Sequence, residues 1–201
     1  PLTIHFESLW AEWLGVEHAV FCNSGSSANL LMYAAAQAFL DDPAPRCIVP
    51  AISWATTVAP AIQLGYHPIL CDADPDTWGM NIGHLTELVE QYRPDVVMIV
   101  HTVGCPNQME PVLELREKHG FLLLEDCCSS YGSTHRGQKV GTLTPGAMEV
   151  VALGLVGRED LKVVIRTSGT EPGALRIAVW MRPGADPTPI VEAFADAAPS
   201  A

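Results

Sequence analysis

Basic residues are scarce in this 201-residue sequence, which has 11 of them against 23 acidic residues and a formal net charge of −12. An excess of negative charge repels polyphosphate backbones and anionic membrane surfaces, so neither nucleic acid nor a membrane is an expected partner. No apolar run approaches the roughly 18 to 20 residues that span a bilayer, and the start has no signal-peptide pattern. We therefore expect a cytoplasmic protein. The missing initiator Met suggests a fragment or a processed form.

The six cysteines lack the spacing of a metal or redox motif. No Cys-x-x-Cys pair occurs among them, and only Cys127 and Cys128 are adjacent. Buried reduced thiols are therefore favoured over disulfides. Because zinc sites need such spaced pairs, no metal site is predicted.

What the sequence does contain is 48% hydrophobic residues, set in short apolar runs that alternate with helical patterns. Helices are expected at 6–14, 26–40, 55–64, 82–92 and 110–119, and strands at 19–22, 47–49, 68–71, 96–100 and 121–124. The strands read as continuous apolar runs, which is typical of parallel strands covered on both faces. We predict an α/β protein with a three-layer α/β/α domain. Its ligand crevice should lie beyond the carboxyl ends of the strands, where the connecting loops converge.

A Gly–Ser-rich loop, Asn23 to Asn29, joins the first expected strand to the long helix that follows it. Backbone N–H groups without an intrahelical partner, the helix dipole and small hydroxyl groups meet there. Together they suit a phosphate or another anion. The alternative is that Ser24 or Ser26 only caps the helix.

Three further loops carry polar or aromatic side chains at strand ends: Trp54, His101 and Asp126. Each alone has a structural interpretation, namely a core or helix-start aromatic for Trp54, a satisfied strand-end histidine for His101, and a helix N-cap or buried hydrogen-bonded carboxylate for Asp126. Together with the Ser-rich loop they describe a pocket for a flat, phosphorylated, nitrogen-bearing ring. Pyridoxal 5′-phosphate fits, with Trp54 stacked on the pyridine and Asp126 paired with its ring N–H.

Four motifs connect the chain to a known family: Asn23-Ser-Gly-Ser-Ser-Ala-Asn29, Ile52-Ser-Trp-Ala-Thr-Thr57, His101-Thr-Val-Gly104 and Glu125-Asp-Cys-Cys-Ser-Ser-Tyr-Gly132. With them, residues from about 5 to 145 resemble the large domain of the DegT/DnrJ/EryC1/StrS family of sugar aminotransferases and dehydratases. The resemblance implies the fold-type-I, aspartate aminotransferase-like fold. It also implies pyridoxal 5′-phosphate or pyridoxamine 5′-phosphate as cofactor, a nucleotide-sugar or sugar-phosphate ligand, and a homodimer.

Carried over by position, the resemblance places the cofactor phosphate on Ser26 and Ser27, the ring stack on Trp54 and the pyridinium partner on Asp126. Ser129 stands where many members carry Gln or His near the ring hydroxyl. The branch similar to the CDP-4-keto-6-deoxyglucose 3-dehydratases is favoured by Trp at position 54, by the His-Thr-x-Gly motif and by the Cys-rich stretch. A role in polysaccharide biosynthesis follows from the same resemblance.

The family next supplies the Schiff-base Lys, or the His that replaces it in a dehydratase branch. That segment falls at about Met148 to Gly157, which contains neither residue. Without this amine or base, no catalytic residue is assigned. The sequence therefore predicts a member of the enzyme family that is incomplete or inactive as this chain. The alternative is a non-catalytic fusion remnant that binds a sugar phosphate or nucleotide sugar.

Residues 146–201 are expected to form a small α+β appendage to the domain of residues 1–145. Within 157–182, the motif Arg166-Thr-Ser-Gly-Thr-Glu-Pro172 resembles the loop of the last phosphohexomutase domain that grips a sugar phosphate. An Arg beside free backbone N–H groups suits that task. The alternative is a plain β-turn between two strands. The resemblance implies a phosphate site on Arg166, Ser168, Gly169 and Thr170.

Overall fold

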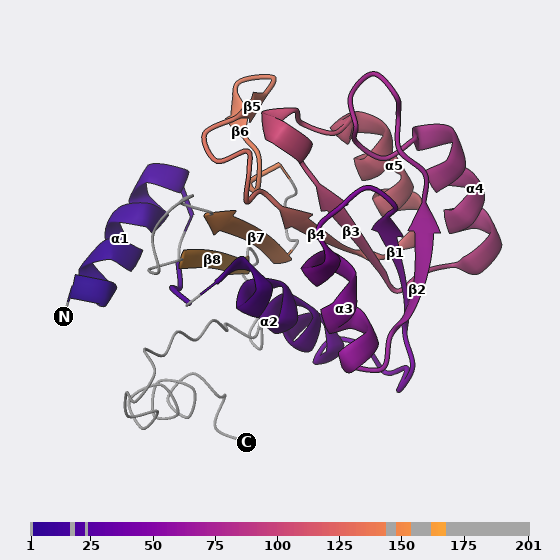
Figure 1. The fold of residues 1–201 in the computed structure, drawn as a ribbon, viewed down its shortest axis with the longest axis horizontal. Helices are drawn as coiled ribbons and strands as arrows, with labels where there is room; N and C mark the ends of the chain where they lie inside the picture. Colours follow the sequence, from indigo (N-terminus) through magenta and orange to yellow (C-terminus); the bar gives the residue numbers. More distant parts are fainter. Residues whose placement is uncertain (1, 17–18, 23, 144–147, 154–161, 168–201) are drawn as a thin grey trace.

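The structure is a computed structural model that describes residues 2–16, 19–22, 24–143, 148–153 and 162–167. Helices and strands alternate through most of the chain, as the sequence predicts (Figure 1). In chain order the elements are α1 (Leu2–Leu14), α2 (Gly25–Gln37), β1 (Arg46–Pro50), α3 (Ala55–Gln63), β2 (His67–Cys71), α4 (Ile82–Tyr92), β3 (Val96–Val100), the 3-10 turn η1 (Thr102–Gly104), α5 (Met109–His119), β4 (Leu122–Asp126), β5 (Thr134–His135), β6 (Gln138–Lys139), β7 (Met148–Leu153) and β8 (Lys162–Thr167).

Among the described residues, the main sheet has six strands in the order β2-β1-β3-β4-β7-β8. All neighbouring pairs are parallel except β7 and β8, which are antiparallel. The chain leaves β1 toward β2 and then returns past β1 to form β3, so the strand order reverses between β1 and β3. Ligands of open α/β sheets bind at such a switch point, outside the carboxyl ends of the strands. The loops that follow β1 and β3 are therefore candidates for a binding site.

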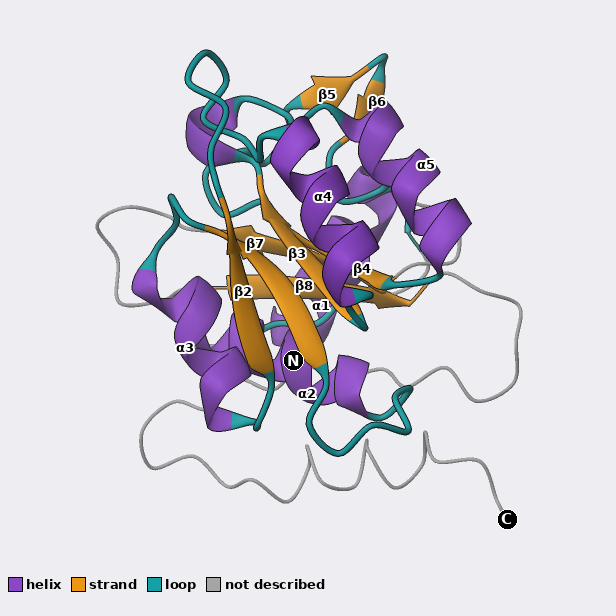
Figure 2. Cartoon of the chain, turned by 90° about the vertical axis from the view of Figure 1, so that its right-hand side faces the viewer, coloured by secondary structure: helices purple, strands orange, loops and turns teal. Residues whose placement is uncertain are grey.

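Helices cover both faces of this sheet, and α4 and α5 lie together on one of them (Figure 2). On that face, Leu14 of α1, Leu85 of α4 and Val112 of α5 belong to one apolar cluster. On the opposite face, Met32 of α2 and Ala61 of α3 belong to a second cluster. Burying one large apolar side chain contributes about 1.5 to 3 kcal/mol. The expected three-layer α/β/α arrangement is confirmed.

One expected strand is absent, and another has different bounds. Residues 19–22 form no strand, because the Phe21 N–H donates to Glu7 Oε1 at 2.9 Å, so that backbone donor bonds a side chain and not a neighbouring strand. The strand expected at 121–124 runs instead from Leu122 to Asp126, in full register with β3. Asp126 therefore lies inside the end of the strand, and not in the loop after it.

The strands after residue 145 continue the main sheet. β7 joins β4 through the register pair Asp126 and Val150, and β8 follows at the edge. The division into domains at residue 145 stays a prediction, and most of the expected appendage lies outside the described residues. Within the described part of the chain, no helix has both the length and the apolar character needed to cross a membrane.

Candidate functional site

The first turn of α2 lies at one side of the site. Ser24 is its N-cap: its backbone is extended, its Oγ accepts from the Ser27 N–H at 3.1 Å, and it donates to Ser27 Oγ at 3.1 Å. The capping interpretation is thus confirmed for Ser24. The amides of Gly25 and Ser26 fall in the turn where no helix carbonyl can accept them. With an exposed Ser26 hydroxyl, the helix dipole and no acidic residue in this turn, they can hold an anion.

Asp126, at the carboxyl end of β4, is buried, with 4% of its surface exposed. Its Oδ1 accepts from the Cys128 N–H at 3.0 Å, and its Oδ2 accepts from Asn29 Nδ2 at 3.0 Å. Burial raises the pKa of the Cys128 thiol to about 12, so this neighbour stays neutral. No cation among the described residues forms an ion pair with Asp126. A protonated ring nitrogen could therefore find an uncompensated carboxylate here.

Asn29 joins the two sides of the site. Its Nδ2 also donates to the Thr56 carbonyl oxygen at 3.2 Å, and Thr56 comes two residues after Trp54. One amide group thus ties α2, the start of α3 and the end of β4, so the predicted convergence of these segments is confirmed. No role for Asn29 was predicted from the sequence. A signal was present, because Asn29 follows Ser26 by three residues and lies on the same side of the helix.

Trp54 and Ser129 both lie on the exposed side of this edge. Trp54 is the residue before α3, makes no capping hydrogen bond with its side chain and is 76% exposed. It is therefore a helix-start aromatic and not a core residue, and its indole face can stack on a planar ligand. Ser129 Oγ donates to the His101 carbonyl oxygen at 3.3 Å, which places it beside the end of β3.

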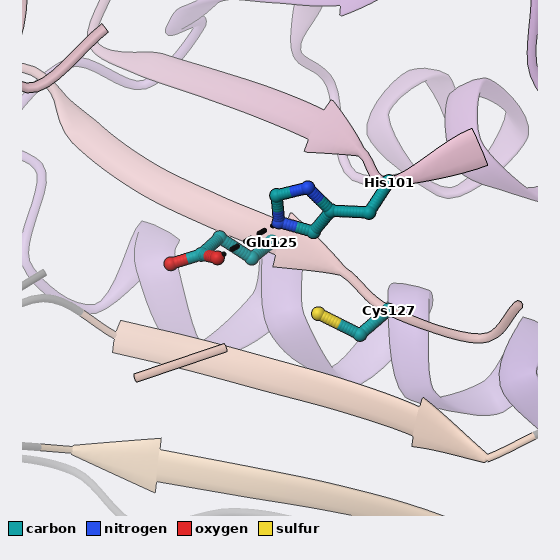
Figure 3. A group of neighbouring side chains, drawn as sticks. All are labelled: His101, Glu125 and Cys127. Atoms are coloured by element: carbon teal, nitrogen blue, oxygen red, sulfur yellow. Dashed lines mark hydrogen bonds and ion pairs between the residues drawn. The ribbon is translucent and has the colours of Figure 1, made fainter. Parts of the chain in front are cut away.

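The opposite face of β4 carries a buried hydrogen-bond network, and its bond between His101 and Glu125 is drawn in Figure 3. His101 Nε2 and Glu125 Oε2 are 3.0 Å apart, and both side chains are fully buried. The Asn107 N–H donates to His101 Nδ1 at 3.0 Å, so Nδ1 holds a lone pair and Nε2 carries the proton. The Gly141 N–H donates to the same Oε2 at 2.9 Å. His101 is thus a satisfied strand-end histidine.

His101, Glu125 and Cys127 are also the group of possible metal ligands found among the described residues, with ligand atoms within 4.8 Å of one another. The hydrogen bonds argue against a metal there. His101 Nδ1 already accepts from Asn107, and Nε2 needs its proton for the bond to Glu125, so neither nitrogen offers a free lone pair. We interpret the group as structural.

Two buried polar atoms beside the α2–α3 contact lack a hydrogen-bond partner within the described part of the chain: Asn29 Oδ1 and Thr57 Oγ1. Buried atoms of this kind are uncommon, and an ordered water or a ligand often satisfies them. With the anion-binding turn of α2, the exposed indole of Trp54 and the buried carboxylate of Asp126, they fit a phosphorylated, planar, nitrogen-bearing ring.

The remaining predicted residues lie apart from this group. Arg166 lies within β8, opposite Glu149 in the register with β7, and not in a loop. Its expected partners Ser168, Gly169 and Thr170 lie outside the described residues, so the tail phosphate site stays a prediction. The segment expected to carry the Schiff-base Lys begins with β7, which lies beside β4 at the level of Asp126. The segment from Met148 to Gly157 contains neither Lys nor His, so the expected absence of a catalytic residue there stays a prediction.

Solved structures share this fold. The GDP-4-keto-6-deoxy-D-mannose-3-dehydratase of E. coli with bound hydrated PLP is 28% identical, with a TM-score of 0.74 over 84% of this chain and 44% of that chain. A mutant GDP-4-keto-6-deoxymannose-3-dehydratase with bound GDP-perosamine is 29% identical, with a TM-score of 0.71 over 83% of this chain and 44% of that chain. The fold is therefore that of the PLP-dependent, aminotransferase-like α/β proteins.

Residues 1–150 match the sequence profile of the DegT/DnrJ/EryC1/StrS aminotransferase family, and the chain belongs to this family. GDP-perosamine synthase of Caulobacter vibrioides is 33% identical over 140 residues, which are 70% of this chain and 37% of that protein. The lipopolysaccharide biosynthesis protein RfbH of Salmonella typhimurium is 37% identical over 142 residues, which are 68% of this chain and 32% of that protein. The chain thus spans about a third of the length of these curated relatives.

Proposed function

We propose that this chain carries the cofactor-binding large domain of a PLP-dependent sugar-nucleotide aminotransferase or 3-dehydratase, and that it binds pyridoxal 5′-phosphate or pyridoxamine 5′-phosphate at the carboxyl edge of its sheet. Membership of the family and the PLP in a solved relative support the cofactor. The observation that carries the proposal is the pair of hydrogen bonds from Asn29 to Asp126 and to Thr56. They bring the expected ring-nitrogen partner and the Trp54 loop to one place.

Each side chain then has a physical task. Ser26 and Ser27, with the first-turn amides of α2, would hold the phosphate. Trp54 would stack on the ring, and Asp126 would pair with the ring nitrogen and keep it protonated. Ser129 would lie near the ring hydroxyl. When bound, the cofactor would supply an electron sink for chemistry at a carbon bonded to an amino group.

The cofactor would bind here without a Schiff base to a Lys of the segment that begins with β7, the strand beside β4. β7 adjoins Asp126, and residues 148–157 offer neither a Lys nor a His. We therefore propose binding of the cofactor without turnover by this chain. The ligand beside the cofactor would be a nucleotide sugar, as the names of the GDP-perosamine synthase and the 3-dehydratases suggest.

Several large apolar side chains are exposed where β1, β3 and β4 end, and they support a subunit contact at this edge. Exposed positions there are Ile52, Trp54, Val103 and Tyr131. Apolar side chains gathered at one edge commonly mark an interface. We propose a homodimer in the cytoplasm, with a role in polysaccharide biosynthesis. Light scattering of the purified chain tests the dimer.

Titration with pyridoxamine 5′-phosphate tests the binding proposal, because this ligand needs no lysine. Saturable quenching of tryptophan fluorescence, reduced by competition with inorganic phosphate, is the expected result. Pyridoxal 5′-phosphate should also bind, and treatment with borohydride should leave the protein mass unchanged. Absence of binding of either ligand would contradict the cofactor site. A borohydride-stable adduct on a lysine would instead contradict binding without a covalent bond.

A further inference from the structure

Pro60 lies inside α3 and is buried there. A proline has no backbone N–H, so it cannot donate to the carbonyl four residues earlier, which belongs to Thr56. The structure supplies a substitute donor from another helix, because Asn29 Nδ2 of α2 lies 3.2 Å from the Thr56 carbonyl oxygen. The amide of Asn29 therefore completes the first turn of α3, immediately after Trp54.

The same nitrogen of Asn29 donates to Asp126 Oδ2 at 3.0 Å. A carbonyl and a carboxylate both accept hydrogen bonds, so the amide nitrogen, and not the oxygen, must face them. This orientation leaves Asn29 Oδ1 without a hydrogen-bond partner within the described structure, although the side chain is buried. An unsatisfied buried acceptor is destabilising. The side-chain amide of Asn29 thus makes two donor contacts, while its unsatisfied oxygen lowers the stability of the fold.

We propose that Asn29 is a positioning residue for the cofactor ring. It fixes the Asp126 carboxylate relative to the start of α3, and hence sets the separation between the ring-nitrogen partner and Trp54. Because its amide is neutral, it orients the carboxylate without cancelling the charge that a pyridinium needs. Asn29 touches no reacting atom and acts through Asp126. This inference rests on the proposed function.

The chain provides a matched control on the same helix. Gln37 Nε2 donates to the Leu64 carbonyl oxygen at 3.1 Å and ties the other ends of α2 and α3 together. A change at Gln37 thus removes a similar interhelical amide contact without involving Asp126. Leu replaces either side chain with an apolar one of comparable size.

The experiment compares Asn29→Leu and Gln37→Leu with the wild type, using pyridoxamine 5′-phosphate as the probe. Asn29→Leu should weaken its affinity by about tenfold to a hundredfold, because a hydrogen bond to a charged group is lost. Gln37→Leu should change the affinity by no more than about twofold. The nitrogen of the bound ring, followed by the absorbance of the ring, should also lose its proton at a lower pH in Asn29→Leu than in the wild type. If Asn29 only held the two helices together, the pH at which the ring loses its proton would not change.

Pro60→Ala separates the two contacts of Asn29, because alanine restores an N–H donor for the Thr56 carbonyl. In this background Asn29→Leu should cost less stability in urea unfolding and still lose its affinity for the probe. If Asn29→Leu fails to fold, Asn29→Ser provides the second variant, with the same expected loss of affinity.

The outcomes separate the inference from the function on which it rests. A wild-type chain that binds neither pyridoxal nor pyridoxamine 5′-phosphate overturns the proposed function, and the positioning role with it. A wild-type chain that binds the probe, with Asn29 variants that bind as well as Gln37→Leu, overturns the positioning role alone. Weakened binding that Pro60→Ala restores would also overturn it, because the effect would then act through Thr56.

Discussion

Glu125 and Asp126 are neighbouring carboxylates in β4, both buried, and the chain uses them in opposite ways. Glu125 accepts from His101 and from the Gly141 amide on the face of α4 and α5. Asp126 accepts from the neutral amides of Asn29 and Cys128, on the face of α2, beside two polar atoms that lack a hydrogen-bond partner among the described residues. The first carboxylate is enclosed by the fold, and the second faces the proposed cofactor site.

The period of a β-strand explains how two adjacent residues can differ so much. Successive side chains of a strand point to opposite faces, so Glu125 and Asp126 enter different layers. Gly141 reaches the first layer as the chain approaches β7, whereas α2 presents Asn29 to the second. The comparison teaches that the environment of a carboxylate, and not its position in the sequence, decides whether it has a structural or a binding role.

The largest expected effect comes from removing the enclosed carboxylate. Glu125→Leu leaves the His101 Nε2–H and the Gly141 N–H without their acceptor in the core. We expect the free energy of unfolding to fall by about 2 to 5 kcal/mol, since each unsatisfied buried donor costs about 1 to 3 kcal/mol. Urea unfolding measures it. Glu125→Gln, which keeps one acceptor oxygen, should recover part of the loss, and equal losses in both variants would contradict the network.

Asp126→Asn tests the other carboxylate. The affinity for pyridoxamine 5′-phosphate should fall by about tenfold to a hundredfold, because the ring nitrogen loses a charged partner. The loss of stability should be smaller than in Glu125→Leu, since the amide keeps one acceptor oxygen. Fluorescence titration and urea unfolding on the same sample give both values. If affinity is retained while stability collapses, the roles of the two carboxylates are not distinct.

Gly79→Ala should weaken the enclosed network from a distance. A Cβ at Gly79 would lie 2.6 Å from Asn107 Oδ1, and Asn107 holds His101. Forcing an extra methyl group into a packed site costs about 1 to 3 kcal/mol of stability. Affinity for the probe should stay near that of the wild type. Thermal unfolding measures the loss of stability. Loss of binding without loss of stability would contradict the independence of the two faces of β4.

Trp54→Ala should give the smallest effect. Its side chain is mostly exposed, so the free energy of unfolding should change by less than about 0.5 kcal/mol. The loss of ring stacking should weaken probe binding by about 0.5 to 1.5 kcal/mol. Trp54→Phe, which keeps an aromatic face, is the control and should bind more tightly than the alanine variant. Equal binding by both variants would contradict stacking.

The sequence predicted the fold well where local patterns decide it. Continuous apolar runs identified the central strands, and the first helix ends at Leu14 as expected, where Gly15 follows with a φ of +83°. The strand expected at 19–22 failed because strand formation depends on a partner. Apolar character could not show that Glu7 would take a backbone donor of that segment.

The candidate site was predicted in part. Position along the strands placed Asp126 and Trp54 at one edge, and motif resemblance added Ser26, Ser27 and Ser129. The hydrogen-bond partners of Asn29 and Asn107 were not predicted. The two partners of Asn29 lie 27 and 97 positions away, so only the folded chain shows what its amide does.

Asn107 bonds through its backbone N–H and both side-chain polar atoms: its N–H donates to His101 Nδ1, its Nδ2 donates to the Val100 carbonyl oxygen, and its Oδ1 accepts from the Met80 N–H. The backbone N–H groups of Met80, Asn107 and Gly141 consequently all donate to acceptors of one buried hydrogen-bond network. None of the three can be released to solvent without disturbing the others. Their hydrogen exchange should therefore report one common free energy of opening, set by a cooperative opening of β3, β4 and the segments around them.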